Sequence, residues 1–212
     1  FGKAAPNDEQ TRQNCNNVLK PLIECGELVI TQGFIGRDEQ GKTTTLGRGG
    51  SDYSAALLAE VLNAQDVLIW TDVAGIYTTD PRIVSNAQRI DTMSFSEAAE
   101  MATFGAKVLH PATLLPAVRS NIPVYVGSSK APQDGGTWVT RNPQPRPTFR
   151  AIALRRDQTL LTLSSLNMLY AQGFLANIFT ILAKHKISVD TITTSEVSVA
   201  LTLDKMGSAA SG

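Results

Sequence analysis

The sequence has little that would attract a charged partner or hold the chain in a bilayer. Its 19 basic residues balance 19 acidic ones, so the formal net charge of zero gives no general attraction to nucleic acid or anionic lipid. No apolar run approaches the ~20 residues that a membrane span needs. We therefore expect no nucleic-acid partner and no membrane partner.

Cysteine and histidine are equally scarce. Cys15 and Cys25 form no CxxC pair, and His110 and His185 are not at ligand spacing with either cysteine. We expect a reduced, cytoplasmic protein without a metal site built from its own side chains. The chain opens on Phe1 rather than Met, shows no signal peptide and stops at "GSAASG", so we expect a piece of a longer protein.

Apolar segments alternate with helical patterns over the first two thirds of the chain. Ser94 and Glu97 form a capping box for one helix, which Gly105 is placed to end. This alternation predicts an α/β layer with a largely parallel sheet. The expected strands are Leu28–Ile35, Asp66–Trp70 and Ile122–Ser129, and two further helices are expected at Ser51–Leu62 and from Pro111 onward.

A composition change near "TRNPQPRPTF" marks a domain boundary. Three prolines within residues 143–147 can continue neither a helix nor a central strand. Beyond them the pattern reads strand, helix, strand, strand. We predict one domain over residues 1–142, a linker over 143–150 and a second, incomplete α+β unit over 151–212.

The stretch "TTTLGRGGSDYSAALLAE" has the composition of an anion site. Gly47, Gly49 and Gly50 let the backbone approach a ligand, and the following helix adds its positive end. Ser51 can cap that helix, and Arg48 offers a planar fork for a carboxylate or phosphoryl group. Asp52 is open to two interpretations: a structural carboxylate at a helix N-terminus, or one that orients reacting groups.

Residues Gly36 to Thr43, "GRDEQGKT", match the P-loop pattern GxxxxGK[ST]. That pattern needs a helix directly after Lys-Thr, whereas "TTLGRGG" follows here and does not favour one. Asp38 and Glu39 would also face a polyphosphate with like charge. A surface hairpin is the preferred interpretation.

The loop "TDVAGIYTTDPR" follows the carboxyl end of a predicted strand, where open α/β sheets bind ligands. Thr71, Asp72, Tyr77 and Arg82 make it either a binding loop or an ordinary polar turn at Asp80-Pro81. Lys107, in "FGAKVLHP", is by itself most simply a surface charge.

Together these segments resemble aspartokinase of the lysine-sensitive bacterial type. The matching stretches are "TTTLGRGGSDYSAALLAE", "WTDVAGIYTTDPR", "EAAEMATFGAKVLHPAT", "IPVYVGSS" and "GFLANIFTILAKHKISVDTITTSEVSVALTLD". The resemblance implies the C-terminal half of an amino-acid-kinase α/β/α sandwich followed by an incomplete ACT unit. It also implies transfer of the γ-phosphoryl group of MgATP to the side-chain carboxylate of L-aspartate.

The resemblance assigns roles to particular residues. Arg48, Gly49, Gly50 and Ser51 would grip aspartate, and Asp52 would join Arg48 in organising the reacting groups. The nucleotide would be lined by Thr71, Asp72, Tyr77, Arg82, Lys107 and Val108.

The second unit would hold L-lysine as a feedback effector and would pair in a homodimer. The implied effector residues are Met168, Phe174, Leu175, Ser188, Val189, Asp190, Thr194, Ser195 and Glu196. For Phe174, Leu175 and Val189 an ordinary core position is an equal alternative. Asp190 would suit the ammonium group of lysine.

The chain departs from the family in one respect: the Lys-Phe-Gly-Gly-Thr-Ser segment, which supplies a phosphate-binding lysine, is absent. We therefore expect the isolated chain to be inactive as a kinase. A non-catalytic amino-acid-binding module is the alternative, and a kinase for glutamate or a carbamoyl group is a third hypothesis, which "GRGGSDY" followed by an ACT unit disfavours.

Overall fold

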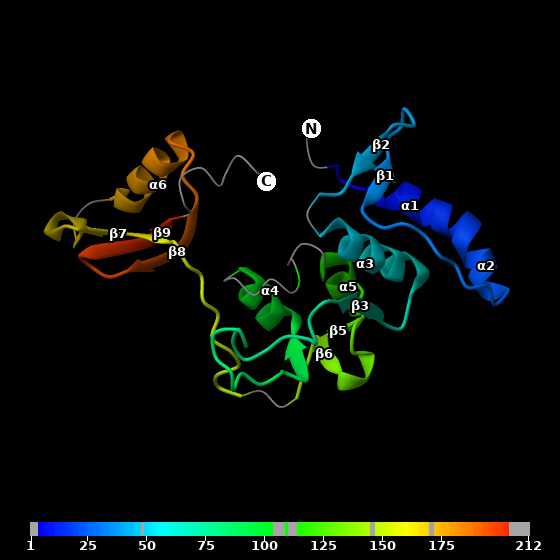
Figure 1. The fold of residues 1–212 in the computed structure, drawn as a ribbon. Coiled ribbons are helices and arrows are strands. Elements are labelled where there is room, and N and C mark those ends of the chain that lie inside the picture. Colours follow the sequence, from blue (N-terminus) through cyan, green and yellow to red (C-terminus); the bar gives the residue numbers. More distant parts are fainter. Residues whose placement is uncertain are drawn as a thin grey trace. The chain divides into compact units, whose positions relative to one another are not determined.

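A computed structural model describes residues 4–47, 49–103, 109, 114–144, 147–169 and 172–203. The chain divides into two compact units, residues 1–154 and 155–212, which are described separately (Figure 1). The predicted linker at residues 143–150 comes shortly before this division. The assignment of the two units as a kinase domain and an ACT domain stays a prediction.

The first unit begins with helical structure that we did not predict. Helix α1 (Asp8–Asn14) continues through a π-helical turn (Cys15–Leu19) into α2 (Lys20–Glu24). Asn7 caps α1, because its side-chain oxygen accepts a hydrogen bond from the Gln10 amide at 3.0 Å. Both cysteines are free thiols, and Cys15 is buried on this helical segment.

The strand predicted at Leu28–Ile35 is wrong for most of its length. The side chains of Leu28 and Ile30 are each 87% exposed, and no strand is assigned before Ile35. A strand needs a hydrogen-bonding neighbour, and among the described residues no strand pairs with residues 28–34. The apolar composition of this segment was therefore not enough to predict a strand.

The preferred interpretation of the "GRDEQGKT" stretch is confirmed. Strands β1 (Ile35–Arg37) and β2 (Thr43–Thr45) pair in antiparallel register to form a hairpin. The Asp38 carboxylate accepts a hydrogen bond from the Lys42 amide at 2.7 Å, which closes the turn. No helix follows Lys42 directly, so the P-loop alternative has no structural support.

A four-stranded sheet forms the centre of the first unit, in the order β3-β5-β6-β4. Two of its three pairings, β3 with β5 and β4 with β6, are parallel, and β5 with β6 is antiparallel. The predicted α/β fold with a largely parallel sheet is confirmed, and two predicted strands lie within one or two residues of their expected places. The strands are β3 (Val67–Thr71), β4 (Thr92–Ser94), β5 (Val124–Ser128) and β6 (Gly136–Thr140).

The helix predicted at Ser51–Leu62 is confirmed as α3 (Gly50–Leu62), and α5 (Leu115–Arg119) is a shorter one. Arg119 joins these two helices to α1, because its guanidinium lies 2.7 Å from Glu60 and 3.4 Å from Asp8. The expected helix start at Pro111 lies outside the described residues.

The capping box predicted at Ser94 and Glu97 is confirmed at the start of α4 (Phe95–Thr103). The Ser94 hydroxyl accepts from the Glu97 amide at 3.1 Å, and the Glu97 carboxylate accepts from the Ser94 amide at 2.7 Å. Arg150 also pairs with Glu97 at 3.1 Å. Burial acts to raise the pKa of Glu97, but these hydrogen bonds and the arginine charge outweigh it and lower that pKa. The expected stop at Gly105 lies outside the described residues.

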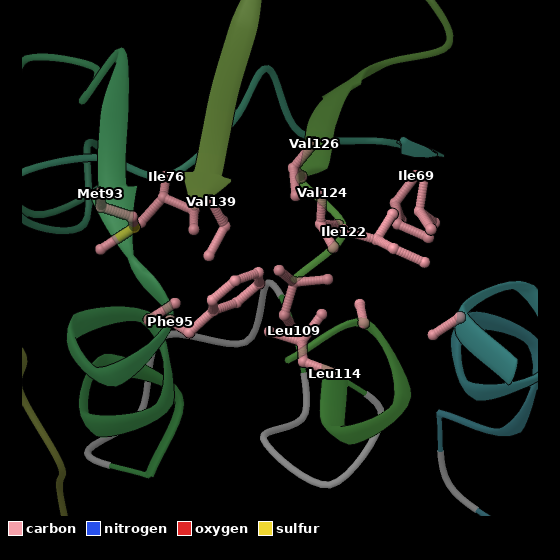
Figure 2. Packing of buried hydrophobic residues seen from close by; sticks show 14 of the residues in the cluster. Ile69, Ile76, Met93, Phe95, Leu109, Leu114, Ile122, Val124, Val126 and Val139 are labelled. Carbon is pink, nitrogen blue, oxygen red and sulfur yellow. The ribbon is translucent and has the colours of Figure 1, made fainter. Parts of the chain in front are cut away.

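One face of the sheet packs against the helices and forms the core of the unit. Figure 2 shows strand residues such as Met93, Val124 and Val139 in one cluster with Phe95 and Leu114. Thr137, which is 0% exposed, places a buried hydroxyl within this apolar layer. Its oxygen accepts from the Ile76 amide at 2.8 Å and donates to the Ile90 carbonyl at 2.6 Å.

The other face of the sheet carries a row of aromatic rings. Tyr125 lies between Trp70 and Trp138, with ring centroids 5.6 and 5.0 Å apart, and Trp70 is 46% exposed. Gly127 and Gly136 are partners on adjacent strands, and a Cβ on either would lie 2.7 Å or less from an atom of Tyr125 or its strand. These two glycines therefore leave room for the tyrosine ring to lie flat over the sheet.

The second unit has the predicted order of strand, helix, strand and strand. Its sheet is antiparallel throughout, in the order β7-β9-β8, and Leu182 of the helix packs on Val199 and Leu201 of the central strand. The elements are β7 (Thr159–Ser164), α6 (Phe174–Lys184), β8 (Val189–Thr194) and β9 (Ser198–Leu203).

The described residues contain neither a membrane-spanning helix nor a cluster of metal-binding side chains. No helix there combines the length and the apolar character that crossing a membrane requires. Within the same residues, no three or more His, Cys, Asp or Glu side chains gather as they would around a metal ion.

Candidate functional site

The first candidate site is the glycine turn, which we define as residues 47–50, where the chain enters α3. Gly47 and Gly49 have φ angles of 79° and 71°, in the left-handed region that glycine tolerates best. The Gly50 amide donates to the Gly47 carbonyl at 3.1 Å and closes the turn. The backbone at the entry to α3 is thus shaped by glycine, as the sequence suggested.

The predicted capping role of Ser51 is wrong. Helix α3 begins one residue earlier, at Gly50, and Gly49 is its N-cap, with no side-chain hydrogen bond to the helix end. Ser51 lies inside the first turn and is exposed. Because no side chain caps this end, the first-turn amides and the positive end of the helix are available to an anionic ligand.

Asp52 lies in the same first turn and is partly buried. Burial raises the pKa of its carboxyl above the ordinary value of 3.8. A carboxylate that is desolvated beside a predicted anion site is poorly explained by a structural role alone. Its position fits a group that orients charged reactants.

The second candidate site lies where β3 and β5 end. Thr71 and Ser128 are register partners at the carboxyl ends of these parallel strands. The Thr71 hydroxyl donates to the Asp72 carboxylate at 3.2 Å, and the Thr71 carbonyl accepts from both the amide (2.8 Å) and the hydroxyl (3.0 Å) of Ser129. Polar groups from two strands therefore meet at the edge where open α/β sheets bind ligands.

Ser129 and Lys130 belong to this edge, although sequence reasoning gave them no role. Lys130 is exposed, and its amide donates to the Ser128 hydroxyl at 3.2 Å. The signal was present in "VYVGSSK", where polar residues follow a buried strand. Its meaning depends on the pairing of β5 with β3, which the sequence does not state.

Tyr77 and Arg82 lie farther along the loop after β3. Tyr77 forms an isolated bridge with Arg89, which gives this part of the loop a fixed backbone. The Arg82 side chain is 84% exposed and pairs with Asp80, with its Nη2 2.7 Å and its Nε 3.0 Å from the carboxylate oxygens. Hydrogen bonds from the Arg82 side chain and backbone lower the pKa of Asp80 to about 2. A phosphate that binds Arg82 would have to share it with Asp80 or replace that contact.

The connection between α3 and β3 indicates that the glycine turn and the end of β3 lie at the same end of the first unit. Only residues 63–66 connect the end of α3 to the start of β3, and such a short connection favours opposite directions for the helix and the strand. The 13 residues of α3 and the five of β3 have similar lengths, roughly 20 and 17 Å. We therefore expect the predicted aspartate and nucleotide residues to approach one another, although Arg48, Lys107 and Val108 lie outside the described residues.

The second unit contains a cavity of about 520 Å³ at the N-terminus of α6. Gly173, with a φ of 78°, is the N-cap of this helix, and no side chain caps it. Five of the nine predicted effector residues line the cavity. The full lining is Met168, Gly173, Phe174, Leu175, Ala176, Ser195 and Glu196.

The other predicted effector residues do not line this cavity. Val189 packs on the core of the unit. Met168 and Phe174, which do line the cavity, also pack on this core with partly buried side chains. Asp190 pairs with Arg155 at 3.0 Å, while its second carboxylate oxygen is buried without a hydrogen-bond partner. Ser188 precedes β8 and Thr194 ends it. The structure therefore separates Ser195 and Glu196 from residues 188–190.

Comparisons with known proteins agree on the kind of protein. A model of the amino acid kinase family matches residues 1–128. The lysine-sensitive aspartokinase 3 of Escherichia coli is 67% identical over 212 residues, which are 100% of this chain and 47% of that protein. The chloroplastic aspartokinase 3 of Arabidopsis thaliana is 44% identical over 84% of this chain and 32% of its own length. The chain thus spans less than half the length of these relatives.

Solved structures show the same similarity. E. coli aspartokinase III in complex with lysine and aspartate, in the T-state, has a TM-score of 0.80 over 98% of this chain and 46% of its own, at 67% identity. The same enzyme with aspartate and ADP, in the R-state, has a TM-score of 0.77 over the same shares. Clostridium acetobutylicum aspartate kinase, at 28% identity, has a TM-score of 0.82 over 93% of this chain and 45% of its own.

Proposed function

The chain belongs to the amino acid kinase family, and from this premise we propose that it carries the nucleotide-binding part and a regulatory part of an aspartate kinase. The reaction is transfer of the γ-phosphoryl group of ATP to the side-chain carboxylate of L-aspartate, which gives 4-phospho-L-aspartate and ADP. Residues 1–142 are assigned to the kinase domain and residues 151–212 to an ACT unit. The proposal is supported by the uncapped, glycine-shaped start of α3 and by the polar residues at the ends of β3 and β5 in the same unit, which we infer to lie at one end of it.

The physical problem in this reaction is repulsion between two anions. The acceptor is already a carboxylate, so no base is needed to remove a proton. An oxygen of that carboxylate forms a bond to the γ-phosphorus while the bond to the β-phosphate oxygen breaks, and ADP leaves with that electron pair. The protein has to hold both reactants in line and offset their charge.

The residues of the chain divide this work. Arg48 pairs with a carboxylate of aspartate, while Gly49, Gly50 and Ser51 present first-turn amides to it. Thr71, Asp72, Tyr77 and Arg82 hold the nucleotide together with Lys107 and Val108. Asp52, desolvated in the first turn of α3, orients the reacting groups.

The donor set fits a Mg²⁺ ion that arrives with the nucleotide. Mg²⁺ commonly binds through one or two carboxylates and substrate phosphates while it keeps several waters. Asp72, exposed at the end of β3, offers such a carboxylate, whereas the described residues hold no cluster able to cage the ion by themselves. When bound, the ion would neutralise charge on the transferred group.

The test is a hybrid enzyme in which this chain replaces the matching 212 residues of E. coli lysine-sensitive aspartokinase 3. We expect the hybrid to form ADP from ATP in an aspartate-dependent manner in a coupled assay, and glutamate to be at least about tenfold poorer as acceptor. The isolated 212-residue chain should show no aspartate-dependent ATP turnover. A hybrid that folds but is inactive, or that prefers glutamate, contradicts the proposal.

A pair of arginine variants sharpens this test. Arg48→Ala in the hybrid should raise the KM for aspartate by about tenfold or more, because a charge-assisted contact to the substrate is lost. Arg37→Ala is the matched control, because Arg37 is an exposed arginine of the neighbouring hairpin and has no proposed contact with substrate. Equal effects of the two substitutions would argue against the assignment of Arg48.

We also propose that the second unit binds L-lysine and that, as in the inference from sequence, two ACT units pair in a homodimer. The cavity at α6 supports an amino-acid ligand, because both the uncapped start of the helix and Glu196 line it. Such an arrangement can receive a carboxylate and an ammonium group together. Residues 188–190 do not reach this cavity, and their contribution to the effector site would come from another copy.

Lysine inhibition provides the measurement. We expect lysine to inhibit the hybrid, and Glu196→Gln to raise the lysine concentration for half-inhibition by about tenfold, because a charged hydrogen bond is weakened. Glu24→Gln, an exposed change in α2, is the control and should leave inhibition unchanged. Binding of lysine without any binding of ATP would instead favour the alternative of a non-catalytic regulatory module.

A further inference from the structure

We propose that Ser54 is a positioning residue of the aspartate site: its hydroxyl ties the glycine turn to the Gly33–Phe34 segment and so fixes the amides that face the substrate. The inference rests on the proposed function, since it assigns a role within that site. It concerns a residue that has no expected contact with either substrate.

The hydroxyl of Ser54 bridges two parts of the chain that lie 20 residues apart. It donates to the carbonyl of Gly50 at 2.8 Å and accepts from the amide of Phe34 at 3.1 Å. The Phe34 carbonyl in turn accepts from the Leu46 amide at 2.9 Å, just before the glycine turn. Residue 34 is therefore bonded to both sides of the turn.

Close packing at two glycines accompanies these hydrogen bonds. A Cβ on Gly33 would lie 3.0 Å from the Cα of Ser51, and a Cβ on Gly50 would lie 2.9 Å from a ring atom of Phe34. The first distance brings the backbone of Gly33 against that of Ser51, and the second brings the Phe34 ring against Gly50, so neither glycine has room for a side chain without a shift. The position of Ser51 thus depends on where the Gly33–Phe34 segment lies.

The backbone conformation of Phe34 is strained, which indicates that surrounding contacts keep this residue in place. Its φ of 71° is in the left-handed region, which is unfavourable for a large non-glycine residue. Strained conformations of this kind persist only where surrounding contacts enforce them, and they concentrate at functional sites. The hydrogen bond from the Phe34 amide to Ser54 is one of the contacts that enforce it.

The simpler interpretation is that Ser54 only bonds back to the preceding turn of its own helix, as serine often does. Thr180 provides that case, because its hydroxyl donates to the Ala176 carbonyl at 2.7 Å within α6. The Ser54 hydroxyl makes the same bond and also accepts from a second segment. The glycine turn has no side-chain cap, and the Ser54 hydroxyl is a side chain that hydrogen-bonds to Gly50 at the end of this turn.

The first measurement is amide hydrogen exchange in the 212-residue chain. Ser54→Ala should raise exchange at Gly49, Gly50 and Ser51 by about fivefold to tenfold, because one hydrogen bond is lost on each side of the bridge. Ser54→Thr retains the hydroxyl and should restore protection. Thr180→Ala, the matched control, should change exchange only within α6.

The second measurement is steady-state kinetics in the hybrid enzyme. Ser54→Ala should raise the KM for aspartate by about fivefold to tenfold, with the KM for ATP changed less than about twofold, and Ser54→Thr should recover most of the loss. A general loss of stability would instead lower the amount of active enzyme without splitting the two KM values.

Two results would overturn the inference. One is unchanged exchange at residues 49–51 in Ser54→Ala; the other is faster exchange there with equal shifts in both KM values. A failure of the proposed function is distinct, because it appears in the unsubstituted hybrid as absence of aspartate-dependent turnover, whereas the exchange measurement needs no activity.

Discussion

We expect Asp52→Asn to lower kcat of the hybrid enzyme by about 10²- to 10³-fold while making the first unit more stable at neutral pH. The loss of rate is the size seen when one preorganised electrostatic group is removed from an active site. The gain in stability has a separate cause, because the carboxylate is partly buried and its ionised form is poorly solvated there. Asparagine has a similar shape and carries no charge.

The pH dependence follows from the direction of the pKa shift. Burial raises the pKa of Asp52 in the folded chain, so between the ordinary value of 3.8 and the raised value the folded state binds more protons than the unfolded state. Stability of the parent therefore falls as pH rises through this window. The advantage of Asp52→Asn should be full above the raised pKa and should vanish below 3.8. Thermal unfolding across this range measures it.

Asp66→Asn is the matched control, because Asp66 is exposed just before β3. It should leave kcat unchanged. Should Asp52→Asn keep full activity, Asp52 has only a structural role, which was the other interpretation of its position at a helix start. Should its stability difference be the same at all pH values, desolvation of the charge is not the cause.

Thr137→Val should reduce the free energy of unfolding of the first unit by about 2–4 kcal/mol. The substitution conserves shape but leaves the Ile76 amide and the Ile90 carbonyl without their buried partner. Each unsatisfied buried group costs about 1–3 kcal/mol. For a unit of this size the midpoint of thermal unfolding should fall by roughly 5–15 °C.

Thr140→Val lies on the same strand, β6, and is the control. Thr140 is only half-buried, so its hydroxyl can be hydrated, and the change should stay within about 0.5 kcal/mol. Equal destabilisation by both substitutions would show that loss of threonine from the strand, and not loss of the buried hydrogen bonds, is responsible. Denaturant unfolding of both variants with unchanged m-values decides between them.

Local patterns in the sequence predicted local structure well. The capping box at Ser94 and Glu97 was found because both partners lie three residues apart, within one turn of helix. The hairpin at Gly36–Thr43 was preferred over a P-loop because the residues after Lys42 disfavour a helix. In each case the interacting residues are close together in the sequence, so a local pattern was enough to predict the structure.

Features that depend on a distant partner were missed. The Leu28–Ile35 segment has the composition of a strand, but composition does not say whether a neighbouring strand exists. Strand β4 has three residues, and β6 begins at Gly136 beside a glycine with positive φ, which reads as a loop. Strands β4 and β6 pair with each other across more than 40 positions, and a linear pattern does not show that pairing.

The candidate site divides in the same way. The glycine turn was predicted from its own residues, although the N-cap lies two residues earlier than expected, because Gly49 in the left-handed region takes the place of Ser51. Ser129, Lys130 and Ser54 were missed. Their relevance comes from the pairing of β3 with β5 and from the contact of residue 34 with α3, neither of which a linear pattern records.

The row of rings on the sheet gives the chain a built-in optical reporter. The sequence contains only two tryptophans, Trp70 on β3 and Trp138 on β6, and they flank Tyr125 of β5. Residues 155–212 contain none. Tryptophan fluorescence therefore reports the thermal unfolding of the first unit alone, whereas far-ultraviolet circular dichroism reports both units. Different unfolding midpoints in the two curves would show that the two units unfold as separate cooperative transitions.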